Sequence, residues 1–250
     1  DDGVMELLVF ATGTSSENPR AELYSFGTGK RELIGETRLD STITSFESIK
    51  YAKTDEGTSI YADALCADGS SMVTEFIYWS DYYNSIISPF YSYSTGRTKE
   101  TLRSSQVTCR DIDDDGYIEI PEDTSSKKQS SEITSQNWVN YGNTVLSHKC
   151  YSFSCKRDGY ILVIDDDDFS KVKANYDSES RKLTIINKKN KSNVFEIVTL
   201  INSNYSVNDP KYKDYTMIMK NSGFVYLAKV NKSSDIDINI QTLKDMIKVY

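Results

Sequence analysis

Residues 111–122 read Asp-Ile-Asp-Asp-Asp-Gly-Tyr-Ile-Glu-Ile-Pro-Glu, and this stretch decides what we expect of the fold around it. Asp111, Asp113 and Asp115 stand at alternate positions, and Gly116 follows them directly. Glycine adopts positive φ without a Cβ clash, so the chain can turn here and bring the three carboxylates together. Calcium takes about six to eight oxygen ligands in proteins. The spacing therefore predicts a calcium-binding loop.

The rest of the same stretch offers further oxygen atoms. We expect a main-chain ligand from the carbonyl of Tyr117, and carboxylate ligands from Glu119 and Glu122. The alternative is an acidic β-turn that binds no ion. Such a turn needs one Asp and one Gly rather than the whole series of carboxylates, which favours calcium.

The residues on either side of the loop predict strands rather than helices. Val107 and Cys109 before the loop, and Ile118 and Ile120 after it, alternate with other residues as in half-buried strands. Pro121 also disfavours helical dihedrals in the residue before it. An EF-hand needs a helix on each side, so we expect a calcium loop that connects strands.

In these features residues 105–122 resemble the loops of FG-GAP repeats, the calcium-binding repeats of integrin-like β-propellers. The resemblance implies ligands at positions one, three, five, seven (main chain) and nine of the loop, which are Asp111, Asp113, Asp115, Tyr117 and Glu119. The family usually carries Asp at the ninth position. Glu119 is one methylene longer, and it is either a direct ligand or a partner bridged by water.

Residues 1–10 repeat part of this pattern. Asp2-Gly3 is followed by two apolar residues, Glu6 and another apolar residue, as in 115–120. This first copy starts inside its loop, without the upstream carboxylates. We therefore expect the chain to be a piece of a longer protein, cut within a repeat.

Composition narrows the classes of function. The chain has 250 residues, which suits one large domain or two ordinary ones, and 37 acidic against 29 basic residues give a formal net charge of −8. This charge disfavours nucleic-acid binding, which depends on neutralising phosphates. No apolar run approaches the ~20 residues of a membrane-spanning segment.

The composition and the predicted calcium loop together indicate where the protein is located in or outside the cell. Eighteen tyrosines and only four prolines point to a β-rich protein. Weak calcium modules, with a Kd of about 10⁻⁴–10⁻³ M, are saturated only outside cells. We expect an extracellular or cell-surface protein, either secreted or a lipoprotein.

The pattern along the chain predicts two domains separated by a linker. Residues 1–122 form a mainly β part, either propeller-blade-like or a sandwich, with short strands over 5–11, 21–26, 48–52, 59–66 and 71–79. We expect a short helix or loop over 80–87. Residues 123–136 are polar at their start and predict a linker.

Residues 137–250 predict an α+β domain with an antiparallel sheet and a C-terminal helix. Strands are expected over 160–164, 182–186, 194–200, 215–219 and 224–230. The helix is expected over 240–248 with Asn239 as its N-cap, and a short helix capped by Asp168 after 165–168. In element order alone, this half loosely resembles modules of the PsbP/Mog1 type.

The four cysteines allow two interpretations. An even number is consistent with two disulfides, and pairing Cys66 with Cys109 and Cys150 with Cys155 keeps each bond within one expected domain. The other interpretation is four free thiols.

Aromatic residues are dense in 76–93. One interpretation is a ligand platform of exposed rings for a glycan or a protein partner, formed by Tyr78, Trp79, Tyr82 and Tyr83. The other, which we favour, is that these rings pack in the core and across strands, where tyrosine and tryptophan also serve.

Patterns of catalytic residues are scarce, and we assign no catalytic residue. His148 is the single histidine, and nothing around it resembles a nucleophile elbow. We therefore predict a non-catalytic, calcium-stabilised binding or adhesion module for a glycan, peptide or cell-envelope partner. The alternative is an accessory part of a secreted glycoside or peptide hydrolase, with carboxylates that are distant in sequence or lie outside the chain.

Overall fold

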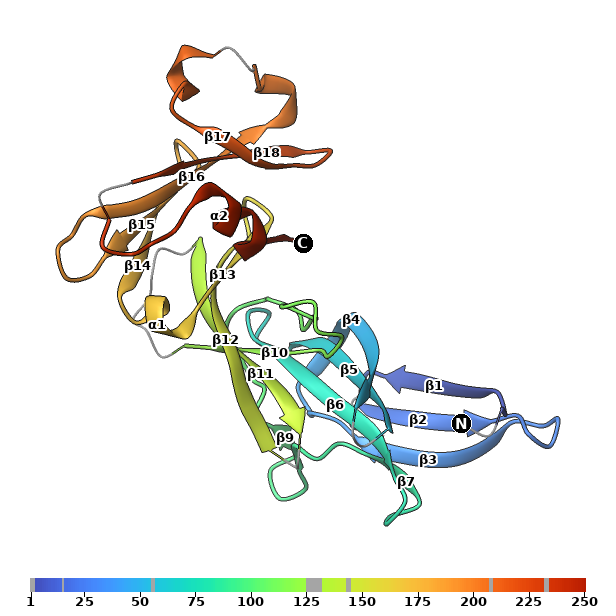
Figure 1. Ribbon diagram of the computed structural model, residues 1–250. Coiled ribbons are helices and arrows are strands. Elements are labelled where there is room, and N and C mark those ends of the chain that lie inside the picture. The colour runs from blue at the N-terminus through green and yellow to red at the C-terminus, as the bar shows by residue number, and fades with distance from the viewer. Residues whose placement is uncertain are drawn as a thin grey trace. The chain divides into compact units, whose positions relative to one another are not determined.

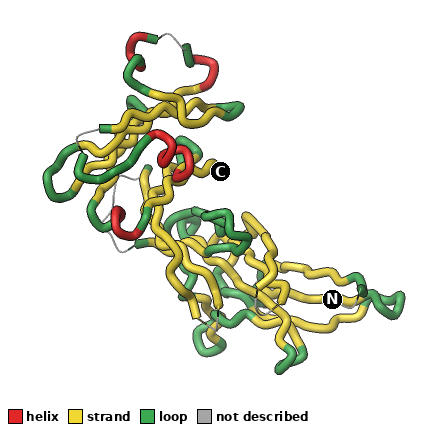
Figure 2. The backbone as a smooth tube through the Cα atoms, in the orientation of Figure 1, coloured by secondary structure: helices red, strands yellow, loops and turns green. Residues whose placement is uncertain are grey.

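The protein is mainly β, with several antiparallel sheets and few helical turns (Figure 2). The computed structural model describes residues 3–14, 16–54, 57–124, 132–142, 145–206, 209–231 and 234–250. The chain divides into two compact units that interleave in sequence. The first comprises Asp1–Asp123 and Trp138–Lys149, and the second comprises Thr124–Asn137 and Cys150–Tyr250.

The first unit contains three antiparallel sheets (Figure 1). One has the order β1-β2-β3, with β1 (Glu6–Ala11), β2 (Arg20–Ser25) and β3 (Glu32–Arg38). The second has the order β4-β5-β6-β7, with β4 (Ile43–Thr54), β5 (Gly57–Cys66), β6 (Met72–Ser80) and β7 (Ser85–Ile87). The third is the short pair β8 (Tyr91–Ser92) and β9 (Arg97–Thr98).

Strand β6 explains why its sheet is covered on both faces. Successive side chains of a strand point to opposite faces. Val73 and Ile77 pack into one core, which also receives Ala21 of β2 and other residues of the β1–β3 sheet. Phe76 packs into a second core, together with Ile120 and other residues from the C-terminal side of the loop. The calcium-loop candidate is thus anchored to the second core.

A further sheet has the order β10-β11-β12-β13-β19. Its strands are β10 (Ile120–Asp123), β11 (Ile133–Gly142), β12 (Val145–Cys155), β13 (Tyr160–Ile164) and β19 (Ile247–Val249). Strands β11 and β12 contribute residues to both units.

The second unit also contains a sheet of order β14-β15-β16-β18-β17 (Figure 1). Its strands are β14 (Val172–Asp177), β15 (Lys182–Asn187), β16 (Asn193–Ile201), β17 (Thr216–Lys220) and β18 (Phe224–Val230). The helical elements are α1 (Asp166–Phe169), η1 (Asn202–Asn204), η2 (Pro210–Tyr212) and α2 (Ile240–Met246). Helix α2 buries Leu243 in the core of this unit.

Both helices differ in detail from the prediction. The predicted N-cap of α2, Asn239, accepts hydrogen bonds from the backbone N–H groups of Gln241 and Thr242. The helix nevertheless ends at Met246, because the next residues pair with β13 as strand β19. At α1 the N-cap is Asp165, and Asp168 lies inside the helix rather than capping it.

Several elements of the first unit were not expected from the sequence, among them β3, β7 and the hairpin strands β8 and β9. Strand β3 has few apolar residues, so its alternation is weak. Its Gly35 lies against β7, where an added Cβ would come within 3.0 Å of the backbone nitrogen of Ile86. Residues 80–87, expected as a helix or loop, contain strand β7, which pairs with the end of β6.

Part of the expected linker can be placed. Residues 125–131 of the range 123–136 lie outside the described residues. Ile133 and Gln136 belong to β11 and are buried, so this end of the range is part of a sheet.

Of the two interpretations of the cysteines, the one without disulfides holds, because none of the four cysteines forms a disulfide. Cys150 and Cys155 lie on the same strand, β12. Five residues of extended chain separate their Cα atoms by about 17 Å, whereas a disulfide needs Cα atoms less than about 7 Å apart. The Cys109 thiol instead donates a hydrogen bond to Asp63 Oδ2 over 3.0 Å.

Candidate metal centre

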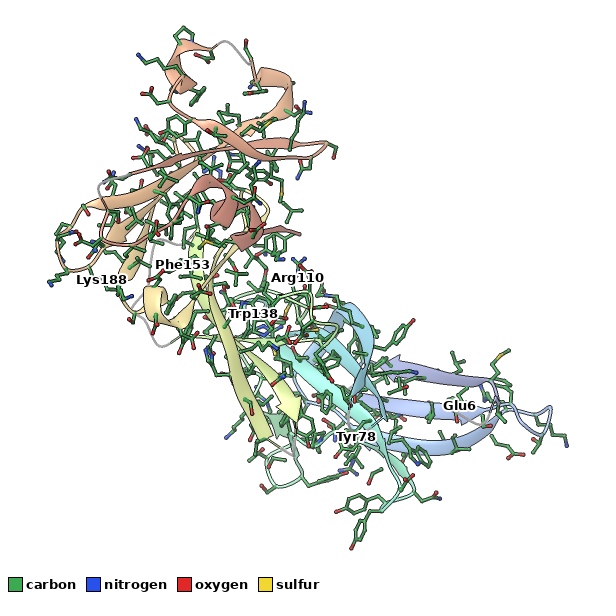
Figure 3. The ribbon with its side chains drawn as sticks, viewed as in Figure 1. Glu6, Tyr78, Arg110, Trp138, Phe153 and Lys188 are labelled. Atoms are coloured by element: carbon green, nitrogen blue, oxygen red, sulfur yellow. The ribbon has the colours of Figure 1, made fainter. Side chains whose placement is uncertain are left out.

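The acidic loop is closed by a short antiparallel bridge between Arg110, labelled in Figure 3, and Glu119. The N–H of Arg110 donates to the carbonyl of Glu119 over 3.1 Å, and the N–H of Glu119 donates to the carbonyl of Arg110 over 2.9 Å. Ile112 and Ile118 are buried. The loop thus has a fixed base, and strand β10 begins directly after it. The entering residues 105–109 lie outside the named strands, so the predicted regular strand before the loop is reduced to this bridge.

Backbone conformation folds the aspartates together. Gly116 has φ 91° and Asp114 has φ 63°, both in the left-handed region. The Asp111 carboxylate accepts hydrogen bonds from the N–H groups of Asp115 (3.0 Å) and Gly116 (2.8 Å). Asp115 Oδ1 accepts from the N–H of Tyr117 over 2.9 Å. The glycine is required by its φ rather than by lack of space, because a Cβ there would meet no atom of the described residues within 4 Å.

Three predicted ligands converge in this loop. Asp111, Asp113 and Asp115 each offer a carboxylate oxygen, and these oxygens lie within 4.8 Å of one another. Two like unit charges about 4 Å apart repel by about 1 kcal/mol in water and about 4 kcal/mol near a protein surface. A cation between them would turn this repulsion into attraction.

Glu119 lies beneath the loop in a fully buried position. Its Oε2 accepts the N–H of Ile112, between the first two aspartates, over 3.0 Å. Its Oε1 has no hydrogen-bond partner among the residues that the structure describes. Burial, followed by the negative charges of Asp113, Asp115 and Asp111, raises the pKa of Glu119 to about 7.

That buried oxygen is the test of whether the residues fit a metal. A buried polar atom without a partner costs about 1–3 kcal/mol, and more when the group is charged. The donors gathered here are carboxylates, with the main chain of the loop beside them. Such oxygen donors suit a hard cation, and a cation in the loop would supply the missing interaction. The residues therefore fit an oxygen-bound metal ion.

Lys149, on strand β12, already places one positive charge at the loop. Its Nζ lies 3.3 Å from Asp113 Oδ2 and forms a closer ion pair with Asp115 Oδ2. The hydrogen bond from Lys149 is the main reason that the pKa of Asp115 is lowered. Sequence reasoning missed Lys149, because it is 34 residues from Asp115 and no local pattern links them.

The other two predicted positions differ from each other. Tyr117 is in the loop, with its side chain partly exposed and its N–H bonded to Asp115. Glu122 lies in β10, three residues after Glu119. Side chains an odd number of residues apart in an extended chain point to opposite faces. Glu122 lies outside the cluster of three aspartates, as does Glu119.

The predicted aromatic platform is divided by the alternation of β6. Tyr78, labelled in Figure 3, packs against the ring of Phe76 at a centroid distance of 5.6 Å, in the second core. Trp79 packs against the first core. Tyr82 and Tyr83 are exposed in the turn between β6 and β7, with ring centroids 4.8 Å apart. The four rings therefore do not share one surface.

A polar depression of about 610 Å³ lies elsewhere on the first unit. Arg20 of β2 and Arg38 of β3, which face each other in register, contribute to its lining. Glu17, Glu36 and Tyr93 also line it. It combines charged hydrogen-bonding groups with one aromatic ring, and sequence reasoning assigned only the general region 76–93 that contains Tyr93.

Among the described residues, no helix is long and apolar enough to cross a membrane. Comparison with protein-family models, with curated proteins and with solved structures finds no match to this chain.

Proposed function

We propose that residues 111–119 bind calcium and that the ion stabilises a non-catalytic binding or adhesion module. The observation that carries this proposal is the cluster of three converging aspartates, together with the buried Oε1 of Glu119, which has no hydrogen-bond partner among the described residues. Asp111, Asp113 and Asp115 would hold the ion, with the carbonyl of Tyr117. Glu119 would act directly or through water.

Calcium suits this set of donors better than other common ions. Zinc prefers nitrogen and sulfur ligands in a tetrahedral arrangement. Magnesium requires near-ideal octahedral geometry and usually keeps several waters. Calcium accepts irregular sets of carboxylate and carbonyl oxygens. An exposed loop of this kind supports the proposal of an extracellular or cell-surface protein, either secreted or a lipoprotein.

The finer description of the fold is also a proposal. For the first unit we propose a sandwich or propeller-blade-like arrangement related to FG-GAP repeats. It is supported by the shared core of the β1–β3 and β4–β7 sheets and by the spacing of the loop carboxylates. For the second unit we propose an α+β module, supported by its antiparallel sheet and helix α2.

The partner is proposed to be a glycan, a peptide or another cell-envelope component. The polar depression offers one site, with arginine and glutamate side chains for hydroxyl or charged groups and the ring of Tyr93 for stacking. The exposed pair Tyr82 and Tyr83 offers a second contact surface. Binding to a glycan array by wild type, Tyr93→Ala and Tyr82→Ser tests these surfaces separately.

One observation keeps the hydrolase alternative open. Glu17 and Glu36 both line the depression, and glycoside hydrolysis uses two carboxylates around one bond. Turnover of a panel of glycosides that is lost in Glu36→Gln would favour this alternative over a binding module.

Calcium binding is tested by a matched pair of substitutions in neighbouring residues. Asp113→Asn removes a carboxylate of the cluster, whereas Asp114→Asn removes an equal charge outside it and retains a residue type that tolerates positive φ. In wild type, calcium at a hundred times its Kd should stabilise the fold by about 2.7 kcal/mol. Calorimetry should show this shift retained in Asp114→Asn and lost in Asp113→Asn. If the melting temperature of the wild type does not change in millimolar calcium, the loop does not bind calcium as proposed.

A further inference from the structure

Lys149 occupies the same carboxylate oxygens that an ion in the loop would need. We propose that Lys149 competes with calcium as an internal cation, so that calcium binds only when it displaces the lysine from Asp113 and Asp115. This inference rests on the calcium site proposed above and adds the residue that limits its affinity.

The hydrogen bonds of the loop leave few oxygens free. In Asp115, Oδ1 is taken by the N–H of Tyr117, which leaves Oδ2 for an ion. That Oδ2 is the atom paired with Lys149 Nζ. Lys149 also lies 3.3 Å from Asp113 Oδ2. Both oxygen atoms of Asp111 already accept one loop N–H group each, so an ion in the loop would also use the Asp113 and Asp115 oxygens that Lys149 contacts.

Lys149 neutralises the loop only in part. The three aspartates and Glu119 carry up to four negative charges, against the single charge of the ammonium group. The contacts of Lys149 are to two aspartates, while Glu119 Oε1 stays unpartnered among the described residues. A divalent ion would bring twice the charge, and it could interact with Glu119 directly or through water.

The lysine can leave without large cost. Its side chain is 29% exposed and the paired aspartates are 31% exposed. Ion pairs of this exposure contribute about 0–1 kcal/mol each. The flexible four-carbon stem can carry the ammonium group into solvent, where it is strongly hydrated. Competition should therefore weaken calcium binding about tenfold rather than abolish it.

Calorimetric titration of the full chain with calcium chloride tests the competition. Lys149→Met should bind calcium about tenfold more tightly than wild type. Lys149→Arg keeps a cation at the site and should stay within about threefold of wild type. Lys99→Met is the matched control: Lys99 is exposed in the same unit, so it reports the effect of one lost positive charge away from the cluster.

Thermal unfolding in two buffers gives a second measurement. In chelator, Lys149→Met should melt below wild type, because two aspartates lose their counter-charge. In saturating calcium the difference should disappear, because the displaced lysine no longer stabilises the wild-type loop. A lysine with a purely structural role would lower the melting temperature by the same amount in both buffers. Lys149→Gln replaces the methionine variant if that variant does not fold.

The outcomes separate this inference from the calcium site itself. Equal calcium affinity in wild type, Lys149→Met and Lys99→Met would overturn the competition and leave the calcium site intact. Absence of binding in all of them would overturn both. Binding in Lys149→Met with none detectable in wild type would support the competition in its strongest form.

Discussion

Two buried glutamates of the first unit, Glu75 and Glu119, differ in whether their carboxylate oxygens have hydrogen-bond partners. Glu75 and Glu119 are both fully buried, and burial is the main cause that raises the pKa of each to about 7. Glu75 Oε1 accepts the N–H of Asp40 and the hydroxyl of Thr98, and its Oε2 accepts the hydroxyl of Ser88. Glu119, in contrast, has one oxygen without a partner among the described residues.

A raised pKa or a buried charge does not by itself mark a functional site, because Glu75 has both and its hydrogen bonds are satisfied within the protein. The Glu75 network is internally satisfied and ties the end of β3 to the β8–β9 hairpin, because Asp40 also accepts the N–H of Thr98 and pairs with Arg97. Among the described residues, Oε1 of Glu119 has no hydrogen-bond partner. We therefore propose a metal ion in the aspartate loop near Glu119 and a structural role for Glu75.

Disrupting a satisfied network should have the largest effect on stability. Arg103 and Asp63 form a fully buried ion pair with a distance of 2.8 Å, and Cys109 also donates to Asp63. Arg103→Met would leave the Asp63 carboxylate buried and uncompensated, which should cost about 3–5 kcal/mol of unfolding free energy. Urea denaturation measures this cost.

The matched control is Arg20→Met, which breaks two ion pairs near the surface. Arg20 is 33% exposed, and its partners Glu17 and Glu22 are 58% and 16% exposed. At about 0–1 kcal/mol for each pair, the loss of both should cost less than about 2 kcal/mol. Similar costs for both variants would contradict the structural role of the buried network.

The Glu75 network should also make stability depend on pH. Burial raises the pKa of Glu75 from 4.5 to about 7, so the folded state keeps a proton that the unfolded state releases. This contribution is complete below pH 4.5 and is lost as pH rises to about 7. The loss is up to about 3 kcal/mol. Residue 75 cannot titrate in Glu75→Gln, so the unfolding free energy of this variant should fall less steeply between pH 4.5 and about 7 than that of wild type. If the two proteins show the same dependence on pH, Glu75 is not the group responsible.

The same substitution in the two glutamates should separate them by their response to calcium. Glu119→Gln removes a charge beneath the loop and should weaken calcium binding at least tenfold. At a calcium concentration of a hundred wild-type Kd, the stabilisation then falls from about 2.7 to about 1.4 kcal/mol. Glu75→Gln should retain the full calcium shift in calorimetry. A loss of the shift in Glu75→Gln instead would reverse our assignment of the two roles.

Contacts between residues close together in the sequence could be predicted, whereas contacts between residues far apart in the sequence could not. The loop aspartates lie within five residues, so their convergence could be predicted from local spacing and one glycine. Lys149 is 34 residues from Asp115, and Asp40 is 35 residues from Glu75. Those contacts depend on strand pairing and loop packing that no local pattern encodes.

Strand prediction had the same limit. The apolar segments of β5 and β6 were predicted within a few residues, because their side chains fill two cores. Strand β3 was not predicted, because it has no clear apolar face. Its Gly35 instead lets strand β7 approach closely. The interpretation of the aromatic residues as a platform rested on their density alone, and the structure instead has Tyr78 and Trp79 on opposite faces of β6.

The smallest expected effect on stability concerns an exposed aromatic ring that has few contacts. Tyr82 is 89% exposed in the β6–β7 turn, and its ring meets that of Tyr83. Tyr82→Ser removes little packing, so the unfolding free energy should change by no more than about 0.5 kcal/mol. Tyr78→Ser is the contrasting variant, because Tyr78 packs on Phe76 and should cost distinctly more. If Tyr82 contacts a partner, Tyr82→Ser should lower binding on a glycan or peptide array while its melting temperature stays at the wild-type value. A large loss of stability in Tyr82→Ser would mean that the ring is structural, and it would leave the polar depression around Tyr93 as the surface to test.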